Sequence, residues 1–509
     1  MNYEVKGSEE AGVPQIKPET PTSHPIGFYF IFWGEFAERC SYYGMRAILF
    51  LYLTQALKFA DNQAGPIYST FKMGCYFLPL LGGFLADRYF GKYWTIVSFS
   101  IPYVLGHFVL GIPNEIALLG ALALLAGGSG VIKPNISTLM GMTYDQKRPG
   151  QKALRTAAFQ WFYFSINVGA VLSTFFLPEI RDHLVKSHLA PYKLTQEIEK
   201  TAEGKETEVF HVTLDGVKVS AEEEARLLLE ARRYAYPLAF QVPAWLMVAA
   251  LLAFAAGKKH YAVEKIERLQ ISEEQRRQRW ETLKQLFVFF TLMVCFWIPY
   301  EYNDTLWVAF TRDYIDRHIP FTDKVIAPDQ LQFLNPLFVL LLIPVFNWIT
   351  RRYDKDVRVL TPFLKIFLGF LFTAMAAGIV STAGILVQGT GEKLSLWWMA
   401  VAYIVLTVGE VLIYGTGLEL AYTAAPQSMK SFITACFLVT NALANLVNIG
   451  VSRLYGGSLV DSADKRGPLT AGVFFVPGAM LALAAGLVFF FTCRKLGKNP
   501  ETEAVAPAE

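Results

Sequence analysis

The chain has 509 residues, of which 53% are hydrophobic, 15% aromatic and only 17% charged. Soluble globular proteins carry about 25% charged residues, so this composition is typical of a membrane protein. The formal net charge of +3 gives no indication of a nucleic-acid partner. The five cysteines form no CxxC pair, so neither a disulfide framework nor a metal site is indicated.

The first 24 residues are polar and rich in proline and glutamate. They lack the basic region and short apolar core of a signal peptide. We therefore expect residues 1–24 to form a disordered cytoplasmic tail, and residues 494–509 to form a second one.

The middle of the chain is dominated by apolar stretches. A membrane-spanning helix needs about 20 apolar residues. Twelve stretches qualify, near residues 27–56, 65–86, 93–111, 115–140, 155–178, 235–256, 285–310, 330–350, 361–387, 396–424, 431–452 and 470–493. They predict an all-α membrane protein with a six-helix bundle over 25–257 and another over 285–493, an arrangement typical of two-bundle transporters.

The distribution of basic residues predicts the orientation of these spans. Lysine and arginine gather in the loops after the second, fourth, sixth and eighth spans, whereas the short loops on the other side carry few. Cytoplasmic loops carry the excess of basic residues in membrane proteins. We expect both termini to face the cytoplasm of a plasma membrane, the inner membrane of a bacterium.

Two segments between the spans are longer than simple turns. In the outward loop 179–234, VFHVTLDGVKVS alternates around Asp215-Gly216 and predicts a β-hairpin, and AEEEARLLLEARRY predicts a helix. We interpret this loop as a variable decoration, although a docking or gating role stays open. Residues 258–284 predict a charged cytoplasmic helix that joins the two bundles along the lipid surface.

The first span carries charges that lipid cannot solvate. Glu35, Glu38, Arg39, Tyr42 and Arg46 fall on one side of the predicted helix. On insertion scales a charge at the middle of a membrane helix costs roughly 2.5–3.5 kcal/mol. This side must therefore face the bundle interior or water. It is either a self-neutralising cluster that only joins helices or, as we favour, a face that binds substrate and handles protons.

Further polar residues recur at membrane depth in other spans, namely Lys133, Asn167, Glu301, Asp304, Asn335, Glu410 and Glu419. Carboxylates of the second bundle can balance cations of the first. Ion pairs that form in one conformation and break in another supply the two-state element that alternating access requires. For the asparagines, helix-packing hydrogen bonds are an equally good explanation.

The stretch LLGGFLADRYFGKYWTI, residues 80–96, contains the most specific short motif. It resembles the G-x-x-x-D-R-x-x-G-[RK] signature of the major facilitator superfamily, with Gly83, Asp87, Arg88, Gly91 and Lys92 in the signature positions. We expect the glycines to permit close helix packing, and the aspartate and the cations to latch a cytoplasmic contact.

The first span indicates one family within this superfamily. E-x-x-E-R-x-x-Y-Y-G, from Glu35 to Gly44, resembles the first-helix signature of the proton-dependent oligopeptide transporter family. The similarity continues through GGFLADRYFGKY, KPN at 133–135, FYFSINVGA, FW-x-x-x-E at 296–301, NP at 335–336 and GEV…TGLELAY…AP at 409–426. Ser69 stands where animal members carry a histidine, which places the proton on carboxylates rather than on an imidazole.

The resemblance implies a proton-coupled symporter that imports di- and tripeptides by alternating access. The resemblance implies that the protein is no enzyme and needs no cofactor besides the coupling proton. We expect it to work in the lipid bilayer as a monomer. The resemblance assigns proton coupling to Glu35, Glu38, Arg39 and Glu301. It assigns substrate binding to Arg39, Tyr43, Tyr76, Lys133, Asn167, Trp297, Asn335 and Glu410. Arg46 with Glu301, and Lys133 with Glu301, resemble gating pairs between the halves.

Three other functions compete with peptide import. A related transporter of nitrate or an organic acid is the first, although Glu410 would repel a simple anion. A peptide sensor that binds without transporting is the second. The third is an intramembrane serine protease. Gly127-Gly128-Ser129-Gly130 resembles the GxSG sequence around a catalytic serine, and His107 lies on a neighbouring span. Glycine-rich helix packing explains that string better.

Overall fold

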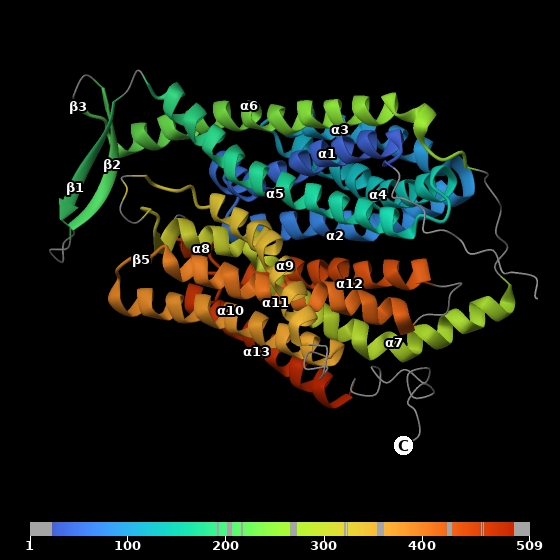
Figure 1. Ribbon diagram of the computed structural model, residues 1–509. Coiled ribbons are helices and arrows are strands. Elements are labelled where there is room, and N and C mark those ends of the chain that lie inside the picture. The colour runs from blue at the N-terminus through green and yellow to red at the C-terminus, as the bar shows by residue number, and fades with distance from the viewer. Residues whose placement is uncertain are drawn as a thin grey trace, which may run out of the picture.

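The computed structural model describes residues 23–190, 193–200, 206–214, 217–264, 272–319, 322, 324–353, 361–424, 430–459, 461 and 463–492. The helices form two bundles that lie side by side, α1 to α6 in one and α7 to α13 in the other (Figure 1). The predicted tails 1–24 and 494–509 lie almost entirely outside the described residues.

The N-terminal bundle contains the helices α1 (Ile26–Leu51), α2 (Asp61–Leu85), α3 (Gly91–Leu110), α4 (Glu115–Lys147), α5 (Lys152–His188) and α6 (Ala221–Ala256). The π-helical turns Tyr52–Ala56 and Ala86–Phe90 extend α1 and α2. α1 packs against α5 and α6, and α3 packs against α4. α4 begins where the side chain of Asn114 accepts hydrogen bonds from two backbone amides of the first turn, a common way to start a helix.

The C-terminal bundle contains α7 (Glu273–Tyr300), α8 (Leu306–Tyr314), α9 (Leu334–Tyr353), α10 (Pro362–Thr390), α11 (Trp397–Ala424), α12 (Lys430–Val451) and α13 (Ala471–Thr492). The 3-10 turn Glu301–Asp304 separates α7 from α8, and Gln330–Phe333 forms another 3-10 turn before α9. α10 packs against α11 and α13, and α7 packs against α12 and α13. The turn after α7 places two acidic residues at a break between buried helices.

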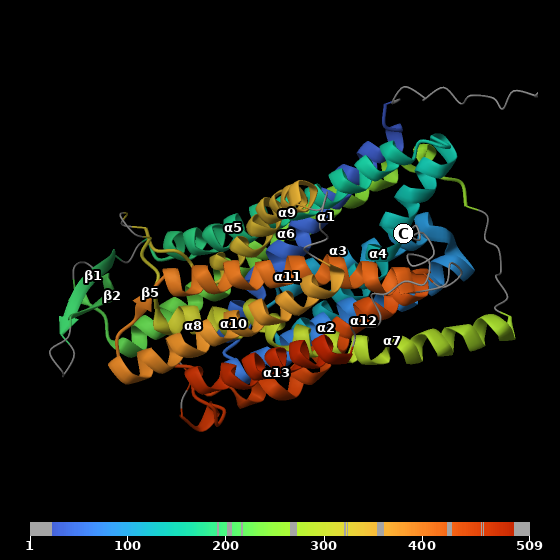
Figure 2. The same cartoon turned by 60° about the horizontal axis from the view of Figure 1, so that its bottom comes forward.

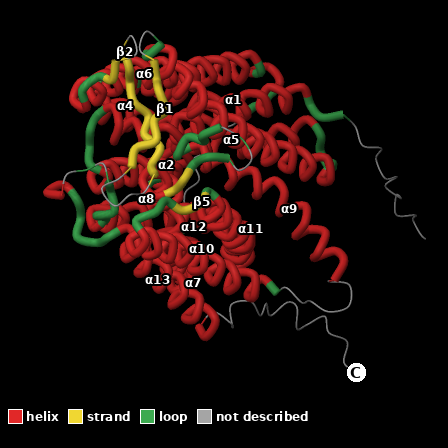
Figure 3. Tube along the Cα trace, turned by 90° about the vertical axis from the view of Figure 1, so that its left-hand side faces the viewer, coloured by secondary structure: helices red, strands yellow, loops and turns green. Residues whose placement is uncertain are grey.

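A small antiparallel sheet of β1 (Lys193–Lys200), β2 (Glu206–Leu214) and β3 (Val217–Lys218) projects from one end of the molecule (Figures 1 and 3). β2 and β3 pair in the register Leu214↔Val217, as expected for the predicted hairpin, whose turn Asp215-Gly216 lies outside the described residues. The sequence analysis did not predict β1. A two-residue parallel pair, β4 (Ile315–Asp316) with β5 (Leu394–Ser395), lies at the same end.

Two predicted helices have different limits in the structure. The helix expected after the hairpin forms the first turns of α6, so the sixth span is longer than 235–256. The linker 258–284 is not one lateral helix in its described part. Residues 258–260 form a 3-10 turn, 261–264 are not helical, and 273–284 begin α7. Figures 1 and 2 show these first turns of α7 extending beyond the other helices, because the apolar residues of the seventh span continue the same helix.

Among the described residues, nine helical ranges are long and apolar enough to cross a membrane. One of them, Asp61–Leu110, contains both α2 and α3. α1 and α9 are not among the nine ranges. α1 carries four charged side chains, Glu35, Glu38, Arg39 and Arg46, the feature that singled it out in the sequence. The chain is thus a helical multi-pass membrane protein, and the number of twelve spans stays a prediction.

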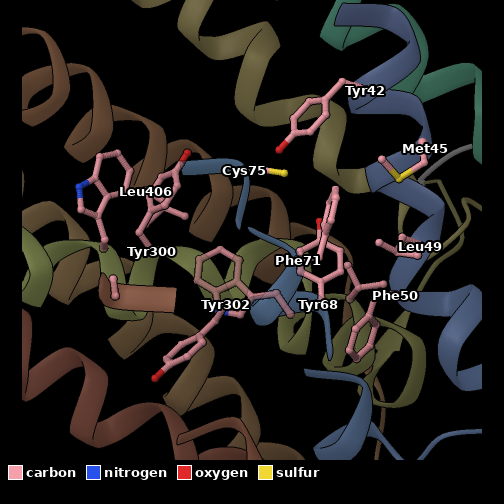
Figure 4. Close-up of a cluster of buried hydrophobic side chains, with 14 of the residues drawn as sticks. Tyr42, Met45, Leu49, Phe50, Tyr68, Phe71, Cys75, Tyr300, Tyr302 and Leu406 are labelled. Carbon is pink, nitrogen blue, oxygen red and sulfur yellow. The ribbon is translucent and has the colours of Figure 1, made fainter. Parts of the chain in front are cut away.

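The two bundles share one hydrophobic core in this conformation. α2 packs against α12, and α5 against α9. In Figure 4, side chains of α1 and α2, among them Tyr42, Met45, Tyr68 and Phe71, lie in one cluster with Tyr300 and Tyr302 of the other half. We call the end where α1 finishes and α2 begins the α1–α2 end.

Candidate functional site

Three buried charged side chains form a cluster on α1. Arg39 Nε lies 2.9 Å from Glu35 Oε1, and the same guanidinium contacts the carboxylate of Glu38. Glu35 and Glu38 are 2% exposed and Arg39 is 3% exposed. The charges therefore face the protein interior, as the helical spacing predicts. Two carboxylates share one guanidinium, so the cluster carries one negative charge when both acids are ionised.

Lys133 of α4 is a cation without a carboxylate partner in the described part of the chain. Its Nζ lies 4.3 Å from the ring centroid of Tyr42 and 5.1 Å from that of Tyr76. Aromatic faces attract cations, but they leave the ammonium hydrogens free to bind an anion. The side chain is only half-buried. Lys133 is thus placed to accept a negatively charged group from outside the protein.

Glu410 of α11 provides the opposite charge on the C-terminal bundle. Its carboxylate accepts a hydrogen bond from Asn335 Nδ2 at 2.6 Å, and Asn335 also lies 3.2 Å from the hydroxyl of Thr407. No cation contacts Glu410 among the described residues. Glu410 lies near Tyr163 of α5 on the other bundle.

Aromatic side chains lie near these charged groups on both bundles. The guanidinium of Arg46 lies over the ring of Tyr43, with its Cζ 4.9 Å from the ring centroid. Trp297 packs edge-on against Tyr414, with ring centroids 5.9 Å apart, and its indole nitrogen has no hydrogen-bond partner in the described structure. Asn167 donates to the carbonyl of Tyr163 within its own helix, which favours the packing role for this residue.

The ion pairs between the bundles differ from the predicted gating pairs. Arg46 pairs with Asp304 at 3.2 Å rather than with Glu301, and Lys133 makes no pair with Glu301. Instead, Lys72 of α2 contacts the carboxylate of Glu301 and lies 2.6 Å from Asp304. In this conformation the 3-10 turn at 301–304 places both acids beside α2, so neither predicted pair is formed here.

The sequence analysis missed Lys72, which is 1% exposed. The signal was present, since a lysine within an apolar span has the same cost as the charges of α1. Asn441 of α12 donates to Glu301 at 2.8 Å and completes the surroundings of that acid. Two cations, Arg46 and Lys72, therefore face two acids, Glu301 and Asp304, across the bundle interface.

Two further pairs join the bundles at the α1–α2 end. Arg312 of α8 contacts Asp61 of α2 at 2.8 Å, and Arg181 of α5 contacts Asp329 of the C-terminal bundle through both guanidinium nitrogens. Both acids are fully buried. The inter-bundle ion pairs in the described structure thus hold the bundles together from the middle of the molecule to this end.

A model of the POT family matches residues 93–273 and 262–461, which together cover more than half of the chain. The chain belongs to the POT family. This confirms the resemblance to proton-dependent oligopeptide transporters on which the sequence analysis rests.

Known POT relatives are similar in sequence and fold. Solute carrier family 15 member 2 of Homo sapiens is 28% identical over 420 residues, 72% of this chain and 51% of the human one. Peptide transporter family 1 of Caenorhabditis elegans is 28% identical over 406 residues, 67% of this chain and 43% of the nematode one. The chain spans about half the length of the curated relatives it matches.

A solved structure shows the same architecture. The crystal structure of an auto-inhibited POT family peptide transporter aligns with a TM-score of 0.72 at 25% identity, over 92% of this chain and 97% of that one. The major facilitator fold expected from the 80–96 motif is therefore the fold of this POT family chain.

The major facilitator signature of this POT member lies between α2 and α3. Lys92 Nζ contacts the carboxylate of Asp87, and the guanidinium of Arg88 lies 5.9 Å from the ring centroid of Phe84. The predicted close packing belongs to Gly82, where a Cβ atom would lie 2.6 Å from Val131, whereas Gly83 has open space around it. The helix rotation that puts Gly82 against α4 could not be read from the motif.

The serine protease alternative has no geometric support. His107 Nε2 lies 3.0 Å from the hydroxyl of Ser41, which donates to the carbonyl of Pro243, and Ser129 Oγ has no hydrogen-bond partner in the described structure. A Cβ atom on Gly128 would lie 2.3 Å from Tyr103. The glycine-rich string therefore serves helix packing. No metal-binding group of histidine, cysteine or carboxylate side chains occurs among the described residues.

Gly91→Ala is expected to lower the free energy of unfolding by about 1–2 kcal/mol, since side chains with a Cβ atom disfavour positive φ by that amount. Gly91 has φ +73°, and its added Cβ would lie 2.5 Å from Glu264 Oε2, which accepts a hydrogen bond from the Lys92 amide. Thermal unfolding of the purified protein measures the change. Gly120→Ala, where the added Cβ meets nothing, is the control. An equally stable Gly91→Ala variant would contradict the packing described here.

Proposed function

We propose that this POT family member imports di- and tripeptides together with protons by alternating access. The observation that carries the proposal is the placement of Lys133 on one bundle and Glu410 on the other, neither of which has an oppositely charged partner among the residues that the structure describes. A free peptide carries a carboxylate and an ammonium at its two ends. A pocket that offers one opposite charge to each end selects short zwitterions almost regardless of side chains.

The proton-coupling role falls to the α1 cluster and Glu301. Glu38 Oε1 is buried without a hydrogen-bond partner in the described structure, so this oxygen is the one placed to carry the proton. Protonation of Glu38 removes one of the two charges that hold Arg39. Arg39 then becomes available, with Lys133, to bind the carboxylate of the peptide. In this scheme Glu35 keeps Arg39 in place when Glu38 is neutral.

Alternating access uses the ion pairs between the bundles. The pairs at Asp304, Glu301, Asp61 and Asp329 would have to part before substrate could enter from the α1–α2 end. We place that end outside the cell, because the loops on the opposite side carry most lysines and arginines. The termini then lie in the cytoplasm of a bacterial inner membrane. The proposal includes no enzymatic step, no cofactor besides the proton and no partner subunit.

Reconstituted uptake tests this function. Proteoliposomes with an acidic exterior are given radiolabelled dialanine and unlabelled competitors of one to four residues, with nitrate as the competitor for the alternative. We expect accumulation that requires the acid gradient and competition by di- and tripeptides only. Competition by nitrate or a simple organic acid would favour the related small-anion transporter. Saturable binding without uptake would indicate a sensor.

Glu410→Ala is expected to weaken apparent affinity for dialanine roughly ten- to a hundredfold, since a hydrogen bond to a charged group contributes about 1.5–3 kcal/mol. N-acetyl-dialanine lacks the ammonium and should lose far less. Competition binding with both ligands makes the comparison. Glu222→Ala, at an exposed position in the first turn of α6, is the matched control. Equal losses for both ligands would exclude an ammonium contact at Glu410.

A further inference from the structure

A separate pocket of about 630 Å³ lies at the α1–α2 end, away from Lys133 and Glu410. The N-terminal bundle supplies one wall from the end of α1 and from α5 and α6. The C-terminal bundle supplies the other from α8 and from the loops that follow α8, α10 and α12. Because both bundles line it, the pocket in this form exists only while they meet at this end.

The pocket carries an excess of positive charge. Its lining includes the basic residues Lys58, Arg181, Lys186, Arg232, Arg312, Arg317 and Lys393. Two acids, Asp182 and Asp313, line it as well, and Asp61 and Asp329 lie behind it. Arg181 and Arg312 are engaged by these four acids. The other five basic side chains form no ion pair in the described structure.

Two of these five, Arg232 and Arg317, are half-buried and come from opposite bundles. Arg317 donates to the carbonyl of Ile326 at 3.1 Å, which uses one of its five N–H groups. Lys58, Lys186 and Lys393 are exposed around them. The pKa of the Lys58 ammonium lies below its usual value, first because the surrounding protein partly shields it from water and second because Arg232 and Arg233 are near.

We propose that this pocket binds a small oxyanion, of which a phosphate group is the best-fitting class. Guanidinium groups present a planar fork of donors that matches phosphate oxygens and holds them by two hydrogen bonds. Half-buried arginines that form no ion pair within the described part of the chain are costly to keep, and a bound dianion would balance the positive charge that both bundles contribute. The phosphate group is either free in solution or part of a lipid headgroup.

A bound anion acts on conformation as well as on charge. It contacts both bundles only when the α1–α2 end is closed, so it favours that state over the one in which the bundles separate. This consequence rests on the proposed alternating access. Binding itself does not, so the anion site can be tested on purified protein whether or not the chain transports peptides.

Equilibrium binding of radiolabelled inorganic phosphate to the purified full chain tests the site, with potassium chloride at matched ionic strength as the reference. We expect saturable binding in the parent protein and at least tenfold weaker binding in the double variant Arg232→Gln/Arg317→Gln. Arg226→Gln, an exposed arginine of α6 outside the pocket, should bind like the parent. Thermal unfolding without phosphate verifies that the double variant is folded, since we expect it to keep a cooperative transition although Arg317→Gln removes the hydrogen bond to the Ile326 carbonyl.

Nanodiscs distinguish the two sources of phosphate. Stabilisation by free phosphate in phosphatidylcholine nanodiscs, lost in the double variant, assigns the site to a soluble anion. Stabilisation by added phosphatidylglycerol, lost in the same variant, with no effect of free phosphate, assigns it to a lipid headgroup. If neither phosphate source stabilises the parent, or if the double variant responds like the parent, the proposal is wrong.

Discussion

Lys72→Met is expected to lower the free energy of unfolding by about 3–5 kcal/mol, the usual cost of removing one partner from a buried ion pair. Lys72 is 1% exposed, contacts the Glu301 carboxylate and lies 2.6 Å from Asp304. Methionine fills a similar volume without the charge, so the change isolates electrostatics from packing. Unfolding of the purified protein by heat and by a denaturing detergent measures the loss.

A second variant shows that the loss has this cause. The double variant Lys72→Met/Glu301→Gln removes one positive and one negative charge, so no buried charge is left without a counter-charge. Asp304 still pairs with Arg46 at 3.2 Å. Glutamine can still accept the hydrogen bond from Asn441. We expect the double variant to recover most of the lost stability. If Lys72→Met is as stable as the parent, or if the double variant is no better than the single one, the buried cluster does not hold the bundles as described.

Glu38→Gln is expected to abolish uptake driven by a pH gradient, with at least a tenfold loss of peptide accumulation, while peptide exchange across the membrane is partly retained. Glutamine cannot release or bind the proton, whereas Arg39 still has Glu35 at 2.9 Å to keep it in position. A proton driven by 100 mV supplies about 2.3 kcal/mol, which corresponds to roughly fiftyfold accumulation of the cargo. Uptake and counterflow into the same proteoliposomes separate the two activities.

Glu222→Gln is the matched control for this prediction, because Glu222 lies exposed at the start of α6. It should leave both uptake and exchange unchanged. If uptake by the Glu38→Gln variant still responds fully to the pH gradient, Glu38 is not the residue that couples transport to the proton. Loss of uptake and exchange together would show instead that Glu38 mainly maintains the structure of the site.

Local sequence signals predicted much of this architecture. Apolar stretches of spanning length indicated the helices, and the spacing of Glu35, Glu38 and Arg39 indicated that one side of α1 faces inward. Those inferences depend only on helical periodicity and on the cost of a charge in lipid, and both are properties of a single segment.

Partners between distant segments could not be predicted in the same way. Asp61 and Arg312 are 251 positions apart, and their contact depends on how the two bundles meet. Glu301 was expected to pair with Arg46 or Lys133, but the rotation of the turn after α7 brings it to Lys72. The family signatures indicated which residue types matter, whereas the ion pairs depend on the conformation that the bundles adopt.

Distances between the bundles test the central claim, that ion pairs at the α1–α2 end part and reform as the cleft changes sides. Spin labels are attached at exposed positions of opposite bundles, Glu115 with Glu392 at the α1–α2 end and Lys147 with Thr492 at the other, in a variant whose natural cysteines are replaced. Pulsed electron resonance then compares neutral buffer with acidic buffer and dipeptide. We predict that a population appears in which the first distance lengthens while the second shortens. Distances that stay constant, or that change in the same direction at both ends, would contradict it.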